Sequence, residues 1–547
     1  MTQVELHGRY EIRFEASLHY PNPVQDVEVK VIFESAGQSR TVQAFWDGGN
    51  LWRVRFCPGT SGIWNWHSLS TNSKDSGLHG RSGEFDCTTH TVLRTTLHHG
   101  PLRVSSSRSH FIHADGIPFF WMADTAWNGP LLSSESDWAF YLTDRAQKGF
   151  SVIQFVSTQW IGAAGDATGS PAYLGQESIR IVPEFFQRLD RRVDLINECG
   201  MVAAPVLAWD AAWNQDSVQL NPGNTLSEEQ LIVLIRYMVS RYGAHNVIWI
   251  LAGDGIYVRE EAERWRRIGR AALSFTDLPA TMHPAGKLWV APEFRDESWF
   301  QLNGYQSGHW NDDDNFRWIN EGPPSSDWRT QPRSPQLNLE PCYEDHIAFT
   351  SGCRISAFDV RRASYWSLLT APPAGITYGA HGVWSWEESP ALPLSHPHAG
   401  IAKPWHEAID LPGSICMAHL KTIFTSLDWW RLQPSPAMLS YQPGKDAPAK
   451  FVSAACSIER DLAMIYSPEG GTIQLHHDFF PHDLTIQCFD PANGALLWQR
   501  LHLKDRDKDS DSIETGNSGD RLLVFRESNQ RKTSLLQVSL ELEKNGL

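Results

Sequence analysis

The chain has 547 residues, of which 41% are hydrophobic and 20% are charged, and its formal net charge is −16. This length exceeds what one hydrophobic core usually supports, so we expect two to four domains of a globular protein. The negative charge argues against nucleic acid and against an anionic membrane surface as partners, because both repel an acidic protein.

The first 90 residues predict a small β-sandwich. Runs that alternate apolar and polar residues, such as VEVKVIFES and LWRVRFCP, are separated by the turn sequences DGGN and PGTSG. The N-terminal sequence MTQVELHGRYEIRFEA lacks the basic region, the apolar segment and the cleavage site of a signal peptide. The eight cysteines are scattered without a C-x-x-C motif, which favours reduced thiols. We therefore expect a cytoplasmic protein that does not contact a membrane.

Between residues 95 and 405 predicted strands alternate with predicted helices, which is the pattern of a (β/α)8 barrel. We expect helices within 134–149, 182–200 and 225–243, with Ser134 as an N-cap and Gly149 as a terminator. The eight strand candidates are 118–127, 151–160, 201–210, 246–254, 279–284, 299–308, 336–341 and 375–386.

After residue 405 an amphipathic helix at 414–432 precedes short strands and turns, which predict a second β-sandwich over 406–547. Its strand candidates include LAMIYSPEGG, RLLVFRES and TSLLQVSLELE, and the charged stretch 504–512 is expected to be a solvated hairpin loop. The expected fold class is therefore α/β: a (β/α)8 TIM barrel at 95–405, flanked by β-sandwich domains at 1–90 and 406–547.

Two predicted barrel strands end in a carboxylate: Asp254 closes HNVIWILAGD, and Glu340 stands near the end of SPQLNLEP. A carboxylate at the end of a buried strand is costly unless it faces a cleft. Two such groups on different strands are the minimum needed to cleave a glycosidic bond. Each also has an ordinary explanation, since Asp254 could be a helix N-cap or turn residue and Glu340 could form a buried salt bridge with Arg333 or Arg361.

Polar and aromatic residues gather at the other predicted strand ends, the face where TIM barrels keep their chemistry. Each has a structural explanation of its own, because a lone histidine is usually hydrogen-bonded and a tryptophan usually belongs to the core. Together they predict a lined pocket for a substrate. The substrate-binding candidates are Asp124, Trp160, Trp209, His283, Gln306, His309, Tyr343, His381 and Trp386.

The sequence gives no sign of a metal or a nucleotide cofactor, so we expect neither. The acidic stretch NDDDN lacks the glycine and the terminal glutamate of an EF-hand loop. The motifs H-E-x-x-H, G-x-x-x-x-G-K-[ST] and G-x-G-x-x-G do not occur. The absence of G-x-S-x-G disfavours a serine hydrolase.

Five sequences in this order, FFWMADTAWNGP, YGAHNVIWILAGD, YQSGH, LNLEPCYED and TYGAHGVWSW, resemble the apiosidase-like glycoside hydrolases (DUF4038, GH140-type). The first 90 residues resemble the DUF5060 β-sandwich, and the last part resembles a C-terminal β-domain of the collagen-binding type. The resemblance implies a retaining glycosidase with Asp254 as acid/base and Glu340 as nucleophile, and it implies substrate binding by Gln306 to His309. One departure is Ala252, where the family often has glycine.

We therefore expect a retaining glycoside hydrolase that acts on a plant- or microbe-derived oligosaccharide, and the resemblance implies apiose as its sugar. Retention requires the two carboxyl groups to lie roughly 5–5.5 Å apart, whereas inversion requires about 6.5–9.5 Å. The alternative is a non-catalytic carbohydrate-binding protein on a TIM-barrel scaffold. The presence of both carboxylates favours the enzyme, because a binding protein needs neither an acid nor a nucleophile.

Overall fold

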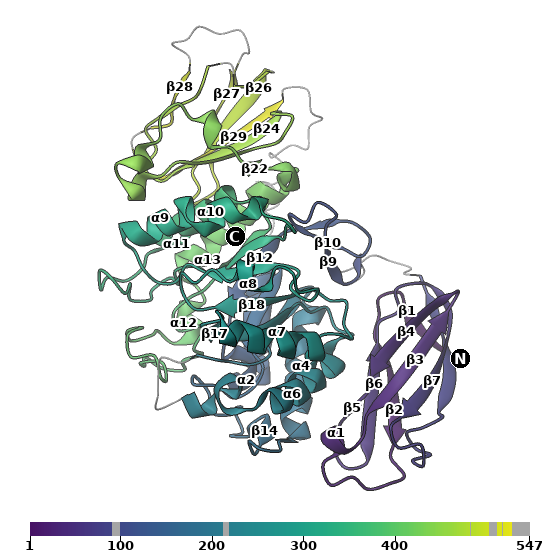
Figure 1. The fold of residues 1–547 in the computed structure, drawn as a ribbon. Coiled ribbons are helices and arrows are strands. Elements are labelled where there is room, and N and C mark those ends of the chain that lie inside the picture. Colours follow the sequence, from purple (N-terminus) through teal and green to yellow (C-terminus); the bar gives the residue numbers. More distant parts are fainter. Residues whose placement is uncertain are drawn as a thin grey trace.

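The computed structural model describes residues 1–89, 99–211, 218–477, 479–481, 483–502, 511–516 and 518–527. They form a central unit of strands and helices, which contacts the N-terminal sheets on one side and the C-terminal sheets on another (Figure 1). Across these ranges, no helix has the length and hydropathy that are needed to span a bilayer.

The first 89 residues form two sheets around one apolar core, as the alternating sequence predicts. Phe33, Phe56 and Phe85 pack together in this core, with the rings of Phe33 and Phe56 stacked at 4.1 Å. The first sheet has the order β1 (Thr2–Glu5), β8 (Ser82–Thr88), β7 (Gly62–Ser70), β3 (Val29–Ser35) and β4 (Gln38–Gln43). The second has the order β2 (Tyr10–Glu15), β6 (Leu51–Phe56) and β5 (Phe45–Trp46), and the short helix α1 (Pro23–Asp26) follows β2 in the chain.

Eight parallel strands follow in the central unit, and each overlaps one of the eight predicted ranges. Six of them form one parallel sheet in the order β18-β17-β16-β13-β12-β21, and β19 and β20 form a separate parallel pair. The bounds are β12 (Trp121–Thr125), β13 (Val152–Val156), β16 (Val202–Val206), β17 (Trp249–Gly255), β18 (Ala280–Pro284), β19 (Asn303–Gln306), β20 (Gln336–Glu340) and β21 (Gly375–Tyr378).

The hydrogen-bond ladders thus form a six-stranded parallel sheet and a two-stranded pair instead of the single closed ring that the sequence predicts. Two gaps separate the ladders, between β18 and β19 and between β20 and β21. The pairing beside each gap is irregular: β17 shifts register against β18 at Gly253, and β19 shifts register against β20 at Gln306. A bulge of this kind bends a strand and interrupts pairing. The coarser prediction of a parallel α/β unit is confirmed.

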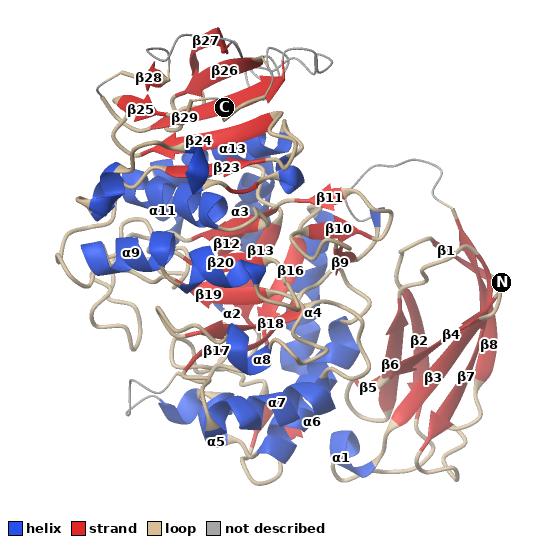
Figure 2. Ribbon diagram, turned by 45° about the horizontal axis from the view of Figure 1, so that its top comes forward, coloured by secondary structure: helices blue, strands red, loops and turns tan. Residues whose placement is uncertain are grey.

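Helices cover the outside of the parallel strands (Figure 2). The helices predicted at 134–149, 182–200 and 225–243 are confirmed, and the side chains of Ser134 and Ser227 cap two of them by accepting a backbone N–H.

The longer helices are α3 (Glu135–Gln147), α4 (Pro183–Glu198), α6 (Glu228–Tyr242), α7 (Glu260–Ala272), α9 (Asp313–Glu321) and α11 (Ala357–Thr370). The short helices are α2 (Gly129–Leu132), α5 (Pro222–Thr225), α8 (Ala291–Phe294), α10 (Pro323–Ser326) and α12 (Trp405–Ala408). The short strands are β9 (Leu102–Val104), β10 (Phe111–His113), β11 (Pro118–Phe119), β14 (Tyr173–Leu174) and β15 (Arg180–Ile181).

The C-terminal unit has a six-stranded sheet with a different partner on each face. Ala463 and Ile465 of β24 belong to a core of the C-terminal unit, whereas Met464 and Tyr466 of the same strand belong to the main core with helices α11 and α13 (Pro412–Thr425). The order is β22 (Gln433–Pro434), β23 (Ser453–Cys456), β24 (Leu462–Ser467), β29 (Arg521–Glu527), β26 (Leu484–Phe489) and β27 (Leu496–His502). The strands β25 (Thr472–Gln474) and β28 (Ser512–Glu514) form a second, smaller sheet.

The predicted helix at the start of this unit is shorter in the structure than the sequence pattern indicates. The helix predicted at 414–432 ends at Thr425, and a 3-10 turn at Trp429–Arg431 follows it. The strand predicted in TSLLQVSLELE and residues 504–510 of the predicted loop lie outside the described residues.

Candidate active site

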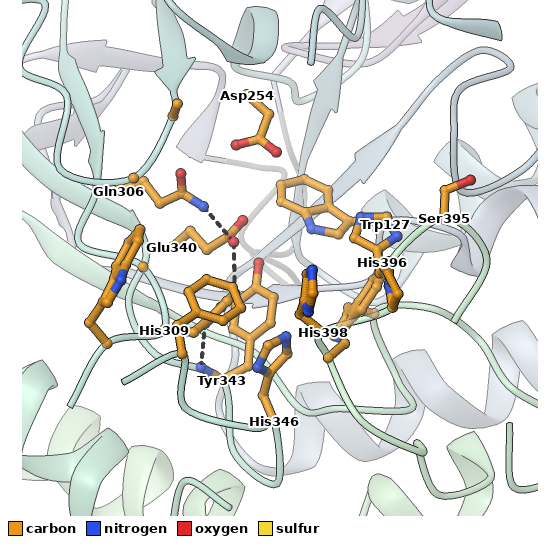
Figure 3. A pocket seen from close by; sticks show the side chains of 18 of the residues that line it. Trp127, Asp254, Gln306, His309, Glu340, Tyr343, His346, Ser395, His396 and His398 are labelled. Atoms are coloured by element: carbon orange, nitrogen blue, oxygen red, sulfur yellow. Dashed lines mark hydrogen bonds and ion pairs between the residues drawn. The ribbon is translucent and has the colours of Figure 1, made fainter. Parts of the chain in front are cut away.

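A pocket of about 650 Å³ contains both Asp254 and Glu340 (Figure 3). Each of these carboxylates stands at the C-terminal end of its parallel strand, β17 or β20, and such ends are where barrel enzymes keep their chemistry. Most of the remaining wall is aromatic, and it also includes Trp127, Trp160, Trp209, Gln306, His309, Trp310, Tyr343, His346, Phe349, Trp384, His396 and His398.

The backbone fixes the position of Asp254. Its φ of +66° lies in the left-handed region, which aspartate tolerates better than most residues. A Cβ at Gly253 would lie 2.5 Å from the Trp209 ring, and a Cβ at Gly255 would lie 2.5 Å from the Tyr257 ring. Only glycine fits on both sides of Asp254 while these rings stay in place.

The Asp254 carboxyl group favours its protonated form. The residue is 8% exposed, and burial is the main cause that holds the pKa of this carboxyl well above its usual value. The negative charge of Glu340 raises the pKa further. Helix α7 begins at Glu260 with Arg259 at its N-cap position, so Asp254 does not cap that helix.

The Glu340 carboxyl group favours its ionised form. Its Oε1 accepts hydrogen bonds from Gln306 Nε2 at 2.6 Å and from His309 Nε2 at 3.1 Å, and its Oε2 lies 3.4 Å from His283 Nε2. Burial opposes ionisation, but the imidazoles of His283 and His309 outweigh it and hold the pKa of Glu340 well below its usual range. Among the described residues Glu340 forms ion pairs with His283 and His309 and with neither Arg333 nor Arg361, and Arg361 pairs with Asp520 at 2.7 Å instead.

The hydrogen bonds around His309 define which ring nitrogen carries its proton. The backbone N–H of Tyr343 donates to Nδ1 at 3.2 Å, so Nδ1 is an acceptor without a proton. The proton of the neutral ring must then be on Nε2, which donates it to Glu340. His309 therefore acts on Glu340 as an oriented hydrogen-bond donor.

Tyr343 lies beside these groups (Figure 3). Burial, followed by the charge of Glu340, raises the pKa of its phenol well above the usual value. The phenol therefore stays protonated and available as a donor. The site as a whole joins a protonated carboxyl, an ionised carboxylate and neutral polar groups, which is the equipment of general acid and nucleophilic catalysis.

Five of the nine predicted substrate-binding residues line the pocket: Trp160, Trp209, Gln306, His309 and Tyr343. His283 lies behind Glu340, with a fully buried side chain. It contacts the carboxylate without being part of the pocket lining.

The structure does not bring Asp124 to the pocket. Successive side chains of a strand point to opposite faces, and Asp124 of β12 points toward helix α3. There it pairs with Arg145 Nε at 2.5 Å and accepts a hydrogen bond from Tyr141 at 2.7 Å. All three side chains are fully buried. The prediction that Asp124 binds a sugar hydroxyl is thus not supported by its position.

His381 and Trp386 also lie outside the pocket lining. His381 Nε2 donates to the Gly400 carbonyl at 2.9 Å, and its Nδ1 accepts from Trp384 at 3.3 Å, so it orients a pocket residue from behind. Trp386 stacks on Trp405 at 4.7 Å. Both residues follow β21 in a loop, and the loop path decides where their side chains point.

Several pocket residues come from loops that sequence analysis did not single out. They include Trp127, Trp310, His346, Phe349, Trp384, His396 and His398. His396 and His398 form an H-x-H pair in the loop after the eighth strand, a spacing that is visible in the sequence. Within the described part of the chain, no group of three or more His, Cys, Asp or Glu side chains is arranged to hold a metal ion.

Comparison with known proteins matches residues 105–431 to the family of apiosidase-like catalytic domains and residues 3–71 to a domain of unknown function, DUF5060. A glycoside hydrolase family 5 structure from Bacteroides vulgatus is 19% identical with a TM-score of 0.69, over 82% of this chain and 99% of that chain. A second structure from Bacteroides vulgatus, described as a candidate glycoside hydrolase, is 17% identical with a TM-score of 0.72, over 96% of this chain and 100% of that chain. At these identities the structures show a shared fold. The comparison with curated proteins found no match.

Proposed function

Because this chain belongs to the apiosidase-like family of glycoside hydrolases, we propose that it is a retaining glycosidase with Glu340 as nucleophile and Asp254 as acid/base. One observation carries the proposal: two carboxyl groups in one pocket have their pKa values shifted in opposite directions. Environments that separate two titrating groups in this way are typical of acid and base partners. A protein that only binds sugar has no need of this pair.

In the first step Glu340 attacks the anomeric carbon and forms a glycosyl ester. The bond from that carbon to the leaving oxygen breaks, and Asp254 gives its proton to this oxygen. Oε1 of Glu340 is held by Gln306 and His309, whereas Oε2 has only His283 beside it at 3.4 Å, so Oε2 is the more open oxygen for the attack.

In the second step water attacks the same carbon from the side that the leaving group vacated. Asp254, now ionised, takes one proton from the water, and the ester bond to Glu340 breaks. Asp254 is protonated again and Glu340 is ionised again, so the enzyme returns to its starting state. Two inversions at one carbon give net retention of its configuration.

The wall of the pocket supports a neutral glycosyl group as substrate. The wall includes the partly exposed Trp310 and the exposed Phe349, whose apolar faces suit the C–H faces of a sugar, whereas the rings of Trp160 and Trp209 are buried and pack 4.6 Å apart. No lysine or arginine belongs to the described lining, so it has no permanent positive charge for a carboxylated sugar. We infer a neutral sugar of a plant- or microbe-derived oligosaccharide, and the family name makes apiose the first sugar to test.

We also propose that the two parallel sheets are arcs of one (β/α)8 barrel. The strands follow one another in chain order, and single bridges span both gaps, between Ala280 and Phe300 and between Glu344 and Ala380. The domain limits at 1–90, 95–405 and 406–547 stay a prediction. The match of the catalytic family extends to residue 431 and therefore includes α13. A cytoplasmic location also stays a prediction.

The test begins with a panel of 4-nitrophenyl glycosides and pectin fragments. Proton NMR of the first product should show the anomer of the substrate, and an inverted first product would contradict retention. The Glu340→Ala variant should lose turnover while its circular dichroism spectrum and melting temperature stay close to those of the wild type. Normal turnover in this folded variant would refute the nucleophile assignment.

A further inference from the structure

The pocket wall includes two histidines, His346 and His396, that the proposed catalytic mechanism does not use (Figure 3). They come from different loops, after β20 and after β21. Neither contacts Asp254 or Glu340 through a hydrogen bond in the described structure. Both line the space in which the proposed substrate has to bind.

Each ring uses one nitrogen to donate to the backbone. His346 Nδ1 lies 2.7 Å from the carbonyl oxygen of Ile347, and His396 Nδ1 lies 2.6 Å from the carbonyl oxygen of Leu394. A carbonyl oxygen only accepts hydrogen bonds, so Nδ1 carries a proton in both residues. In a neutral ring the opposite nitrogen, Nε2, then has a free lone pair and is an acceptor.

The surroundings keep both rings neutral. Burial is the main cause that lowers the pKa of His346 well below its usual value. The His346 ring stacks on His309 at 4.2 Å. Burial also lowers the pKa of His396, and the hydrogen bond to the Leu394 carbonyl and the charge of Glu340 only partly oppose the shift. Its ring neighbours Trp160 and Trp384 are uncharged.

The Nε2 atoms of both residues have no hydrogen-bond partner among the described residues. A ligand that satisfies these two atoms must present hydroxyl donors. A sugar ring meets this requirement, whereas an apolar ligand or an anion without hydroxyl groups does not.

We propose that His346 and His396 recognise the bound sugar by accepting hydrogen bonds at Nε2 from two of its hydroxyl groups. This inference rests on the proposed glycosidase function and names the positions at which that function selects its sugar. The two histidines are binding residues, because they act on hydroxyl groups and not on the bond that breaks. A sugar that lacks either hydroxyl loses one of these contacts.

The tautomers can be tested without any substrate. In the full-length protein labelled with ¹⁵N at histidine, long-range proton–nitrogen correlation spectra distinguish a protonated Nδ1 from a protonated Nε2. His346→Gln and His396→Gln assign the two signals. At pH 7 both residues should be neutral with the proton on Nδ1, and a charged ring or a proton on Nε2 in either would overturn the proposal.

Recognition is tested with variants and deoxygenated substrates together. His346→Phe and His396→Phe keep an aromatic ring and remove the acceptor, and each should lower kcat/KM about 10-fold through KM, the loss expected for one hydrogen bond. The matching glutamine variants place an amide oxygen near the position of Nε2 and should restore part of the loss. His406→Gln, at an exposed position of helix α12, serves as a control outside the pocket.

The decisive comparison uses 4-nitrophenyl glycosides that each lack one hydroxyl group. The absence of one particular hydroxyl should cost the wild type about 10-fold and cost the corresponding phenylalanine variant almost nothing, because the contact is already lost. Equal losses in wild type and variants for every position would refute the proposal. If no glycoside is cleaved, the proposed function fails, and tryptophan fluorescence titrations with free monosaccharides and their deoxy forms make the same comparison for binding.

Discussion

At the scale of single residues, the pocket holds two carboxyl groups in opposite protonation states by giving them different neighbours. Glu340 has three polar side chains around its oxygens, whereas burial dominates the surroundings of Asp254. Hydrogen-bond donors stabilise a carboxylate, and removal from water destabilises it. The difference in neighbours therefore supports Glu340 as the proposed nucleophile and Asp254 as the proposed acid.

The Asp254→Asn variant should separate the two chemical steps. Asparagine keeps the shape of the side chain and tolerates the left-handed φ, but it has no proton to donate to a leaving group. We expect kcat/KM to fall about 10²- to 10⁴-fold for a 4-methoxyphenyl glycoside and far less for a 2,4-dinitrophenyl glycoside, whose leaving group needs no proton. Steady-state kinetics with both substrates measure this difference. Equal losses for the two would contradict the role of Asp254 as general acid.

The pH dependence of kcat/KM should be bell-shaped, with its limbs assigned by the direction of each shift. Activity is lost as pH falls through the lowered pKa of Glu340 and as pH rises through the raised pKa of Asp254. In His309→Ala the carboxylate loses one donor, so the acid limb should move up by about one pH unit. An acid limb that does not move would show that His309 does not stabilise the charge of Glu340.

The sequence predicts the catalytic pair better than it predicts the rest of the pocket. Asp254 and Glu340 could be found because each is the isolated acid at the end of an apolar strand. Asp124 has the same kind of position, but its side chain falls on the outer face and meets Arg145. His346 and His396 lie in loops, and no local pattern tells which way a loop side chain will point.

At the scale of elements, the end of β17 determines where the acid stands. The strand pairs with β18 through a shifted register at Gly253 and Gly255, and Asp254 between them has a positive φ. Such a conformation costs of order 1–3 kcal/mol and persists only when its neighbours hold it. The rings of Trp209 and Tyr257 pack against these two glycines and so hold the turn.

The Gly253→Ala variant tests this arrangement. Its new methyl group would lie 2.5 Å from the Trp209 ring and 3.0 Å from Val206, so the strand end or the ring must move. We expect a loss of about 1–3 kcal/mol in the free energy of unfolding, the usual cost of overpacking, together with a large loss of kcat. Urea denaturation and steady-state kinetics measure the two effects.

Ala252→Gly is the matched control one residue earlier on the same strand. It creates no clash and should keep kcat, at a cost of about 0.5–1 kcal/mol for the added freedom of the unfolded chain. A Gly253→Ala enzyme as active as this control would show that Trp209 does not fix the acid.

The elements themselves were largely predictable from local sequence. Ser134 and Ser227 mark the starts of α3 and α6, and the apolar strands stand out between polar helices. The pairing between strands was less predictable, because register shifts such as that at Gln306 depend on how distant strands meet. This is why the eight strands were located correctly while the continuous ring of ladders was not found.

At the scale of the whole molecule, buried ion pairs join both flanking units to the central one. Arg361 of α11 binds Asp520 through two hydrogen bonds at 2.7 and 2.8 Å, and Tyr466 of the C-terminal sheet donates to the same carboxylate at 2.9 Å. On the N-terminal side Asp190 of α4 lies between Arg241 of α6 and Arg55 of β6. Such pairs orient domains, because an unpaired buried charge is strongly unfavourable.

Asp190 is the residue through which we expect the N-terminal unit to be held in place. Its Oδ2 binds Arg55 Nη2 at 2.6 Å, and its Oδ1 binds Arg241 Nε at 2.7 Å. Burial opposes the charge of Asp190, but the two arginines outweigh it and lower the pKa of the carboxyl. The stabilisation from this group is therefore complete above the usual pKa of an aspartate and is lost as pH falls through the lowered value.

Removing this carboxylate should loosen the N-terminal unit without touching the chemistry. Asp190→Ala leaves Arg55 with Glu11 and Arg241 with Asp47 as remaining carboxylate partners. We therefore expect a loss of about 3 kcal/mol in urea denaturation, the lower end for a broken buried pair, and a larger radius of gyration in solution scattering. The control is Arg191→Ala on the same helix. The ion pairs of Arg191 with Glu135 and Glu198 are solvent-exposed and should contribute less than about 1 kcal/mol.

Since Asp190 does not line the pocket, kcat/KM of the folded Asp190→Ala variant should match the wild type. Equal stability losses in the two variants would show that the buried pair does not join the units, and a selective loss of kcat/KM in Asp190→Ala would mean that the N-terminal unit also shapes the active site.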